Sequence, residues 1–163
     1  MNPSPSHAIA PGPNHGQFAL ICRVREWLCA LPLSQVVETM RPLPIETLAS
    51  MPDFVRGLAR ARGKPLPVVD LGAMLGASAP ARASRFVMVR VEERRVLLAV
   101  EEVLGVRELE PAEAEDLPPL LGAGTESVVA SVGVLDAALL VVLRGARLVP
   151  PSTLDVATAK RGT

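Results

Sequence analysis

The chain of 163 residues is long enough for one domain or two very small ones, and 49% of its residues are apolar. Aromatic residues make up only 2%, so Val, Leu, Ala and Met must fill the core. Lys and Arg together number 17, as do Asp and Glu, and no basic run disturbs this balance. This neutral charge gives no electrostatic reason to expect a nucleic-acid partner.

The N-terminal stretch lacks the basic start and apolar segment that are typical of a signal peptide. The most apolar segment, residues 128–143, contains Gly133 and Asp136 and is shorter than the ~20 residues that a membrane-spanning helix needs. We therefore predict a cytoplasmic protein with no direct membrane insertion.

The first ordered element is predicted to be a β-hairpin over residues 18–31, after a Pro- and Ser-rich tail. Its polar centre, residues 25–26, provides a two-residue loop. In that register the cross-strand neighbours are Val24 with Trp27 and Cys22 with Cys29. Such loops prefer Asn-Gly or a single Gly, so a longer loop is the alternative.

The next segments alternate short apolar runs with turn residues. A strand or strand-turn is expected at residues 33–40, a helical turn at 45–53, and strands at 54–58 and 66–69, on either side of an Arg-Gly turn. Asp70 is placed to cap a short helix that reaches Leu75 and ends at Gly76.

The second half of the sequence repeats the first. An offset of 67 positions places residues 21–24 on 88–91 without a gap, and it places Val36 on Val103. With seven extra residues around 111–124, residues 66–69 fall on 140–143. Five short strands in each half, without a long helix, favour a small barrel.

The predicted fold is therefore all-β, with two fused five-stranded SH3-like barrels related by an internal repeat and with short helical turns. The expected organisation is as follows: a disordered tail over 1–16, one domain over 17–150 and a flexible tail over 151–163. Within that domain we expect a first barrel over 17–76, a linker over 77–84 and a second barrel over 85–150.

Residues suited to catalysis are scarce. Both histidines, His7 and His15, lie in the predicted tail, whereas a general base or a metal ligand needs a rigid mount. Cys22 and Cys29 have no third ligand and form no CxxC motif, so we predict no metal site and no cofactor. Reduced, buried thiols are favoured for the two cysteines over a redox-active pair. The chain is predicted to bind and not to catalyse.

Residues 54–76, FVRGLARARGKPLPVVDLGAMLG, resemble the signature of the chemotaxis coupling-protein (CheW-like) family. That signature has a Val-x-Gly strand, an Arg-Gly turn, a Pro-Val-x-Asp-Leu strand end and a Leu-Gly close, and all four occur here in order. The resemblance extends over about residues 17–150. It departs from the pattern at Ser131, in place of a glycine, and at Arg144, in place of an acidic residue.

The resemblance implies a receptor- and partner-binding set consisting of Val36, Glu38, Gly57, Arg62 and Val103. Arg62 matches an arginine at the receptor-binding surface. Val36, Glu38 and Gly57 match other positions implicated in partner binding, and Val103 is the repeat equivalent of Val36. Core packing remains an alternative role for Val36, and backbone geometry remains one for Gly57.

In function, the resemblance implies an adaptor that couples the cytoplasmic helices of chemoreceptors to the regulatory domain of a histidine kinase. We expect a monomer in free solution that is recruited to receptor arrays at the inner membrane. The alternative is a diverged adaptor that binds receptors but no kinase. An enzyme on a small barrel and a regulatory domain cut from a kinase are less favoured, because structured histidines and kinase motifs are absent from the sequence.

Overall fold

The structure is a computed structural model, and it describes residues 17–76, 82–109, 114–116, 129–135 and 138–143; for the last three ranges only the backbone is described. The expected tails over 1–16 and 151–163, residues 111–113 and 117–124 of the expected loop, and the residue Arg144 lie outside the described residues. The same holds for residues 77–81 of the expected linker and for the side chain of Ser131.

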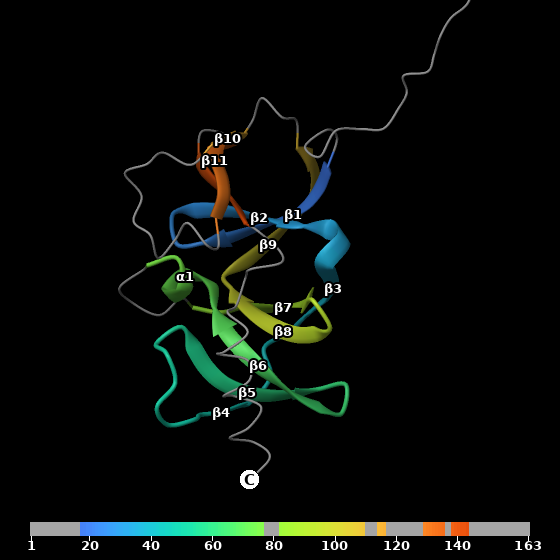
Figure 1. The fold of residues 1–163 in the computed structure, drawn as a ribbon, viewed down its shortest axis with the longest axis vertical. Helices are drawn as coiled ribbons and strands as arrows, with labels where there is room; N and C mark the ends of the chain where they lie inside the picture. Colours follow the sequence, from blue (N-terminus) through green and yellow to red (C-terminus); the bar gives the residue numbers. More distant parts are fainter. Residues whose placement is uncertain (1–16, 77–81, 110–113, 117–128, 136–137, 144–163) are drawn as a thin grey trace, which may run out of the picture.

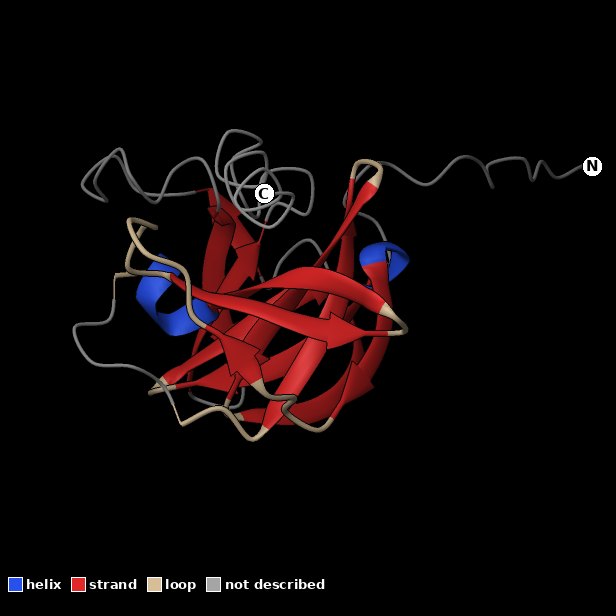
Figure 2. Cartoon of the chain, turned by 90° about the horizontal axis from the view of Figure 1, so that it is seen from below, coloured by secondary structure: helices blue, strands red, loops and turns tan. Residues whose placement is uncertain are grey.

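Strands make up almost all of the described secondary structure (Figure 2), which confirms the all-β prediction. The strands of the first half are β1 (Gln17–Val24), β2 (Trp27–Pro32), β3 (Val36–Met40), β4 (Ile45–Glu46), β5 (Val55–Ala61) and β6 (Lys64–Asp70). Those of the second half are β7 (Arg85–Val91), β8 (Arg94–Val100), β9 (Glu102–Leu109), β10 (Ala114–Asp116), β11 (Val129–Leu135) and β12 (Ala138–Leu143). The helical segments are the 3-10 helix η2 (Leu33–Gln35) and the helix α1 (Leu71–Met74).

The strands form two sheets, each with five longer strands and one short edge strand. The strand order is β10-β11-β12-β2-β1-β9 in one sheet and β3-β7-β8-β6-β5-β4 in the other. We call them barrel A and barrel B (Figure 1). All six strands of barrel B contribute apolar side chains to one cluster, which includes Phe86, Met88 and Leu97, so that sheet curls around its own interior.

Each barrel takes strands from both halves of the sequence, so the expected boundary between 17–76 and 85–150 needs correction. Hairpin β1–β2 joins β9 to β12 in barrel A, and hairpin β7–β8 joins β3 to β6 in barrel B. The exchange occurs where Pro32 ends β2 and η2 turns the chain out of the first sheet. An alternating apolar pattern reveals where strands lie but not which strands pair.

The pairings in the two barrels follow the repeat. Val36 lies opposite Val89 between β3 and β7, and the equivalent Val103 lies opposite Cys22 between β9 and β1. The parallel strand pairs also follow the repeat. Val68 lies beside Leu97 in barrel B, and the backbone of the equivalent residue Val142 lies beside Ala30 in barrel A. The two barrels are therefore related by a pseudo-two-fold arrangement in which the halves exchange strands.

The barrels share an apolar layer that we call the inter-barrel core. Barrel A contributes buried side chains such as Leu20 and Leu31, and barrel B contributes others such as Val69 and Leu98. This layer confirms the expectation that the barrels are fused through a common interior. Partner-site candidates that touch this layer are therefore also structural residues.

The first hairpin has the predicted two-residue loop and the predicted register, with Val24 opposite Trp27. Arg25 adopts a φ of 60°, which suits a tight turn although it is not glycine. The Glu101 carboxylate accepts a 3.0 Å hydrogen bond from the Arg25 backbone N–H. Glu101 lies between β8 and β9, and its contact stabilises a turn whose own sequence is unfavourable.

Candidate functional site

The most exposed polar feature among the predicted site residues is an ion pair between Glu38 on β3 and Arg62 in the β5–β6 turn. Arg62 Nε and Nη2 donate to the two carboxylate oxygens of Glu38 at 2.9 and 2.6 Å. The Arg62 side chain is 70% exposed and that of Glu38 is 28% exposed. Two parallel N–H···O bonds fix the direction of the guanidinium, so the pair presents a defined polar surface.

Local backbone geometry places Arg62 at the tip of its hairpin. Arg62 and Gly63 both have positive φ, 52° and 78°, as a two-residue hairpin turn requires. The hydrogen bonds from Arg62 lower the pKa of Glu38 below its usual value of 4.5, and the charges of Arg62 and Arg95 act in the same direction. Glu38 is therefore ionised at neutral pH.

Val36 and Val103 occupy equivalent places in the two barrels. Both are partly buried and pack against the inter-barrel core. Each is followed by a β-bulge residue, Val37 on β3 and Leu104 on β9. The side chains of these bulge residues point outward, with exposures of 41% and 44%. The structure thus gives Val36 and Val103 a packing role and leaves their neighbours open to contact.

Gly57 is buried on β5 and has a φ of +141°. A Cβ atom at this position would lie 2.1 Å from the backbone oxygen of Glu46 on β4. The residue therefore permits the close approach of two strands and offers no side chain to a partner. The neighbouring residue Arg56 forms a bulge, and its side chain points toward Asp70 at the end of β6.

Arg56 and Asp70 form the most buried ion pair that is recorded for the described residues. Arg56 Nη2 donates to Asp70 Oδ2 at 2.7 Å, and the Asp70 side chain is 2% exposed. The other oxygen, Oδ1, accepts the Ala73 N–H at 3.1 Å and caps α1, as predicted. Gly76, with a φ of +101°, follows the end of the helix. The Pro-Val-x-Asp-Leu strand end is therefore an anchor for β5, β6 and α1.

Exposed large apolar side chains form a set that the sequence alone did not reveal. We call it the apolar strip, and it consists of Phe18, Leu33, Val37, Leu104 and Val106. Val106 lies opposite Leu20 and Glu108 opposite Phe18, so Phe18 and Val106 are diagonal neighbours on one face of β1 and β9. Leu33 follows Pro32, the residue paired with Ala19, and it therefore comes beside the start of β1. The 67-residue repeat relates Val37 to Leu104 and could have indicated that the two residues have similar surroundings. Their exposure could not be predicted, because it depends on which strands pair.

Cys22 and Cys29 lie directly opposite each other and are fully buried in the inter-barrel core. Burial raises the pKa of the Cys22 thiol to about 12 and raises that of Cys29 further. Both are free thiols, and deprotonation in the folded state is suppressed. These properties agree with an apolar packing role for the pair.

Within the part of the chain that the structure describes, no three His, Cys, Asp or Glu side chains gather in a way that could hold a metal ion. Among those same residues, no helix is long and apolar enough to cross a membrane.

Comparisons with known proteins agree with the geometry. The model of the CheW-like domain family matches residues 19–151. The chain is 36% identical to Protein PilI of Pseudomonas aeruginosa over 94 residues, or 55% of this chain, and it spans about half (52%) of that relative's length. The crystal structure of the scaffolding protein TtCheW from Thermoanaerobacter tengcongensis has a TM-score of 0.68 and 22% sequence identity. That similarity covers 79% of this chain and 89% of the other, and it supports the fold.

The family match spans most of the chain and includes both exchanged hairpins and the Glu38–Arg62 pair. Members of this family are non-catalytic scaffolding adaptors, so the prediction that the chain is not an enzyme is confirmed. The chain belongs to the CheW-like domain family, whose members are scaffolds in chemotaxis-type signalling.

Proposed function

We propose that this chain couples the helical cytoplasmic tip of a chemoreceptor to the regulatory domain of a histidine kinase. The observation that carries the proposal is the exposed apolar side chain of Val37 beside the Glu38–Arg62 ion pair. Val37 belongs to the strip and directly precedes Glu38, so apolar and charged contacts are adjacent on β3. An amphipathic helix with an apolar face and polar flanks suits such a surface.

The pseudo-two-fold arrangement supports an adaptor that binds two partners. Barrel A and barrel B have equivalent edge strands, β9 and β3, but their exposed residues differ. Two related but non-identical surfaces allow two partners to bind without competing for one site. On this proposal the chain is cytoplasmic, is a monomer when free, and is recruited to receptor arrays at the inner membrane.

The partner-binding roles of the predicted residues divide into two groups under this proposal. Arg62 and Glu38 contact the receptor directly, because Arg62 is exposed and holds the partly exposed Glu38 carboxylate beside it. Val36, Val103 and Gly57 act through the backbone and core that support the surface. Substitutions in the second group lower binding only as far as they disturb the fold.

The test is calorimetric titration of the full chain with a chemoreceptor cytoplasmic fragment and, separately, with the kinase regulatory domain. We expect Arg62→Ala to weaken receptor binding about tenfold, as for a contact at an interface, while the melting temperature stays within a few degrees. Arg60→Ala is the matched control, because it removes the same charge from the same hairpin. A large fall in melting temperature with Arg62→Ala would show a structural role instead.

The kinase titration separates the proposed adaptor from the diverged one. Binding of both partners, together with a change in kinase activity when receptor is present, supports coupling. Receptor binding without kinase binding at tens of micromolar supports the alternative, an adaptor that serves a receptor array without this kinase. If neither partner binds, the proposed function is wrong.

A further inference from the structure

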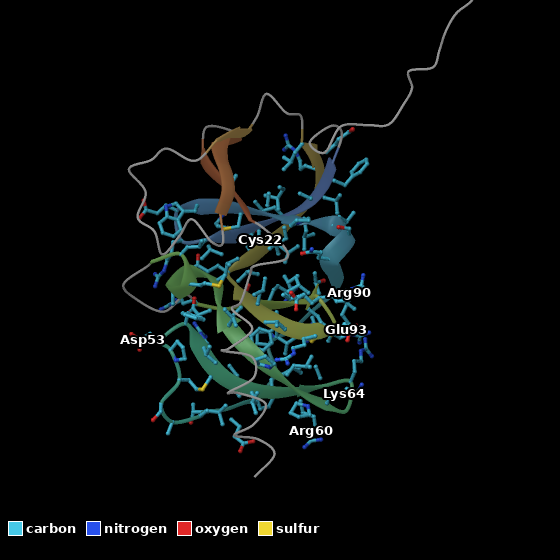
Figure 3. The ribbon with its side chains drawn as sticks, viewed as in Figure 1. Cys22, Asp53, Arg60, Lys64, Arg90 and Glu93 are labelled. Carbon is cyan, nitrogen blue, oxygen red and sulfur yellow. The ribbon has the colours of Figure 1, made fainter. Side chains whose placement is uncertain are left out.

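One end of barrel B gathers arginine and lysine side chains around Glu38. Strands β6 and β8 run parallel and side by side, with Val68 beside Leu97. Their first residues, Lys64 and Arg94, therefore lie at the same end of the barrel, together with the β5–β6 and β7–β8 turns. In Figure 3, Lys64, Arg90 and Glu93 lie along one side of the molecule at this end.

Strand alternation directs three further cations to the same face as Glu38. Glu38 lies opposite Met88, whose side chain faces the interior of barrel B. Arg90 is two residues beyond Met88, Arg95 is two before Leu97, and Lys64 is two before Leu66, so each shares that face at its exposed end. We call the set of Arg62, Lys64, Arg90 and Arg95 around Glu38 the cationic rim.

The pairing of Arg90 with Arg95 is unfavourable for the fold. The two arginines lie directly opposite each other across β7 and β8, and like charges in that position destabilise a sheet. Glu38 faces Arg95 closely enough for that charge to lower the carboxylate's pKa, but its hydrogen bonds go to Arg62. No ion pair is recorded for Lys64 or Arg90 within the described part of the chain.

The chemistry of the rim favours carboxylates of a protein over nucleic acid. Glu38 already demonstrates that a carboxylate fits Arg62 with two hydrogen bonds. The whole chain has a formal net charge of zero and 2% aromatic residues, so it lacks both the broad positive field and the stacking surfaces of a nucleic-acid binder.

We propose that the cationic rim is a docking site for an acidic protein segment, in which Glu38 occupies one carboxylate position until the partner arrives. The partner's carboxylates bridge Arg90 and Arg95 and compete with Glu38 for Arg62. This inference deepens the proposed function, on which its biological meaning rests, because it assigns an acidic character to the partner surface that meets β3. Binding of an acidic peptide can be tested without any receptor or kinase.

The experiment measures fluorescence anisotropy of a labelled oligo-glutamate peptide of about ten residues with the full chain at about 50 and 300 mM salt, since salt screens charge contacts. We expect saturable binding at low salt that weakens strongly at high salt. The Arg90→Ser/Arg95→Ser double variant should bind about tenfold more weakly, as for close charged contacts. Its melting temperature should not fall, because a repulsive pair has been removed.

The control is the Arg60→Ser/Arg85→Ser double variant, which loses the same charge from exposed sites outside the rim. Arg60 lies opposite Pro65 and Arg85 opposite Val100, and neither position faces the barrel B interior. Retained binding by this control supports the rim, and equal loss in both variants overturns it as a general charge effect. Equal or stronger binding of a single-stranded oligonucleotide or of anionic phosphatidylserine vesicles would also overturn the proposal.

Failure of the rim and failure of the adaptor function give different results. Undiminished binding of receptor and kinase by the Arg90→Ser/Arg95→Ser variant, together with no peptide binding by the wild type, rejects the rim alone. Peptide binding that depends on Arg90 and Arg95, in a chain that binds neither receptor nor kinase, supports the rim and rejects the proposed function.

Discussion

The two edge strands β3 and β9 occupy equivalent positions in the repeat but present different chemistry. On β3 the bulge residue Val37 is followed by Glu38, which bonds to Arg62. On β9 the bulge residue Leu104 is followed by Gly105, which has a φ of +127°, and then by exposed Val106. The backbone plan is thus shared, but the residues after the bulge differ: a carboxylate paired with Arg62 on β3, and a glycine followed by an exposed valine on β9.

This difference shows how a repeated fold can acquire two separate binding surfaces. Each bulge bends its strand locally, so Val36 and Val103 pack on the inter-barrel core while the bulge residue that follows points outward. The bulge residues Val37 and Leu104 are exposed to solvent, so they can change without loss of packing. Residues that can contact a partner therefore lie next to structural ones: Val36 and Val103 are partly buried, whereas Val37 and Leu104 are exposed.

The largest expected effect is a loss of stability at a crowded glycine in barrel B, which can be compared with an open glycine in barrel A. Gly57→Ala should lower the free energy of unfolding by about 3 kcal/mol or more, because backbone strain adds to a collision with Glu46. Gly105→Ala should cost about 1–2 kcal/mol, because φ is strained but no atom lies within 4 Å of the new Cβ. Urea unfolding of both variants gives the two values. Equal losses would show that β4 moves away from β5 at little cost.

The buried ion pair of barrel B should have the next largest effect. Asp70→Ala leaves Arg56 without this partner and α1 without its cap, and we expect a loss of about 2–3 kcal/mol, since Arg56 is partly exposed. The control is Arg23→Ala, which breaks the exposed 3.5 Å pair with Glu102 in barrel A and should cost below about 1 kcal/mol. Chemical denaturation measures both losses. A loss for Asp70→Ala as small as that of the control would contradict the anchoring role.

Substitution of the two bulge residues tests whether the edges bind partners equally. Val37→Ser should weaken binding of a receptor fragment about tenfold, and Leu104→Ser should weaken it less, because Val37 directly precedes Glu38, which is proposed to contact the receptor. Calorimetric titration gives the two affinities, and thermal melts should show small changes because both side chains are exposed. The reverse order of effects would place the main apolar contact with the receptor on β9.

The smallest effect is the pH dependence of the Glu38–Arg62 pair. The folded-state pKa of Glu38 is lowered, so its contribution to stability is present above the usual value of 4.5 and is lost as the pH falls through the lowered pKa. The difference in unfolding free energy between wild type and Glu38→Gln should therefore be small at neutral pH and should shrink in acid. Denaturant midpoints from pH 7 to about pH 3 measure it, and a constant difference would show that the ion pair adds nothing to stability.

Local features of the fold could be predicted from the sequence, because they depend on residues close together in the chain. The pairing of Cys22 with Cys29 and the cap from Asp70 both follow from local pattern. The helical turn expected at 45–53 is wrong, since the described structure there is the short strand β4 followed by turns. Pro44 and Pro52 flank this segment and leave little length for a helix.

Features that depend on long-range pairing could not be predicted in the same way. The exchange of hairpins between barrels requires knowing that β1 pairs with β9 and β3 with β7, and apolar alternation is the same for either choice. The apolar strip follows from that exchange, because Leu104 and Val106 lie on an edge strand. At the candidate site, Arg62 and Glu38 were both proposed, but their mutual ion pair emerged only from the geometry.

The exchange of hairpins also has a consequence for synthesis on the ribosome. Barrel B needs only β3 to β8, so its strands are all available once Val100 has left the exit tunnel. The β1–β2 hairpin emerges first, yet its sheet partners β9 and β12 are made last, up to Leu143. The earliest hairpin therefore waits for the latest strands, and barrel B becomes the surface on which the nascent chain completes barrel A. Contacts this distant in sequence fold slowly, so the order of translation favours barrel B as the first folded unit.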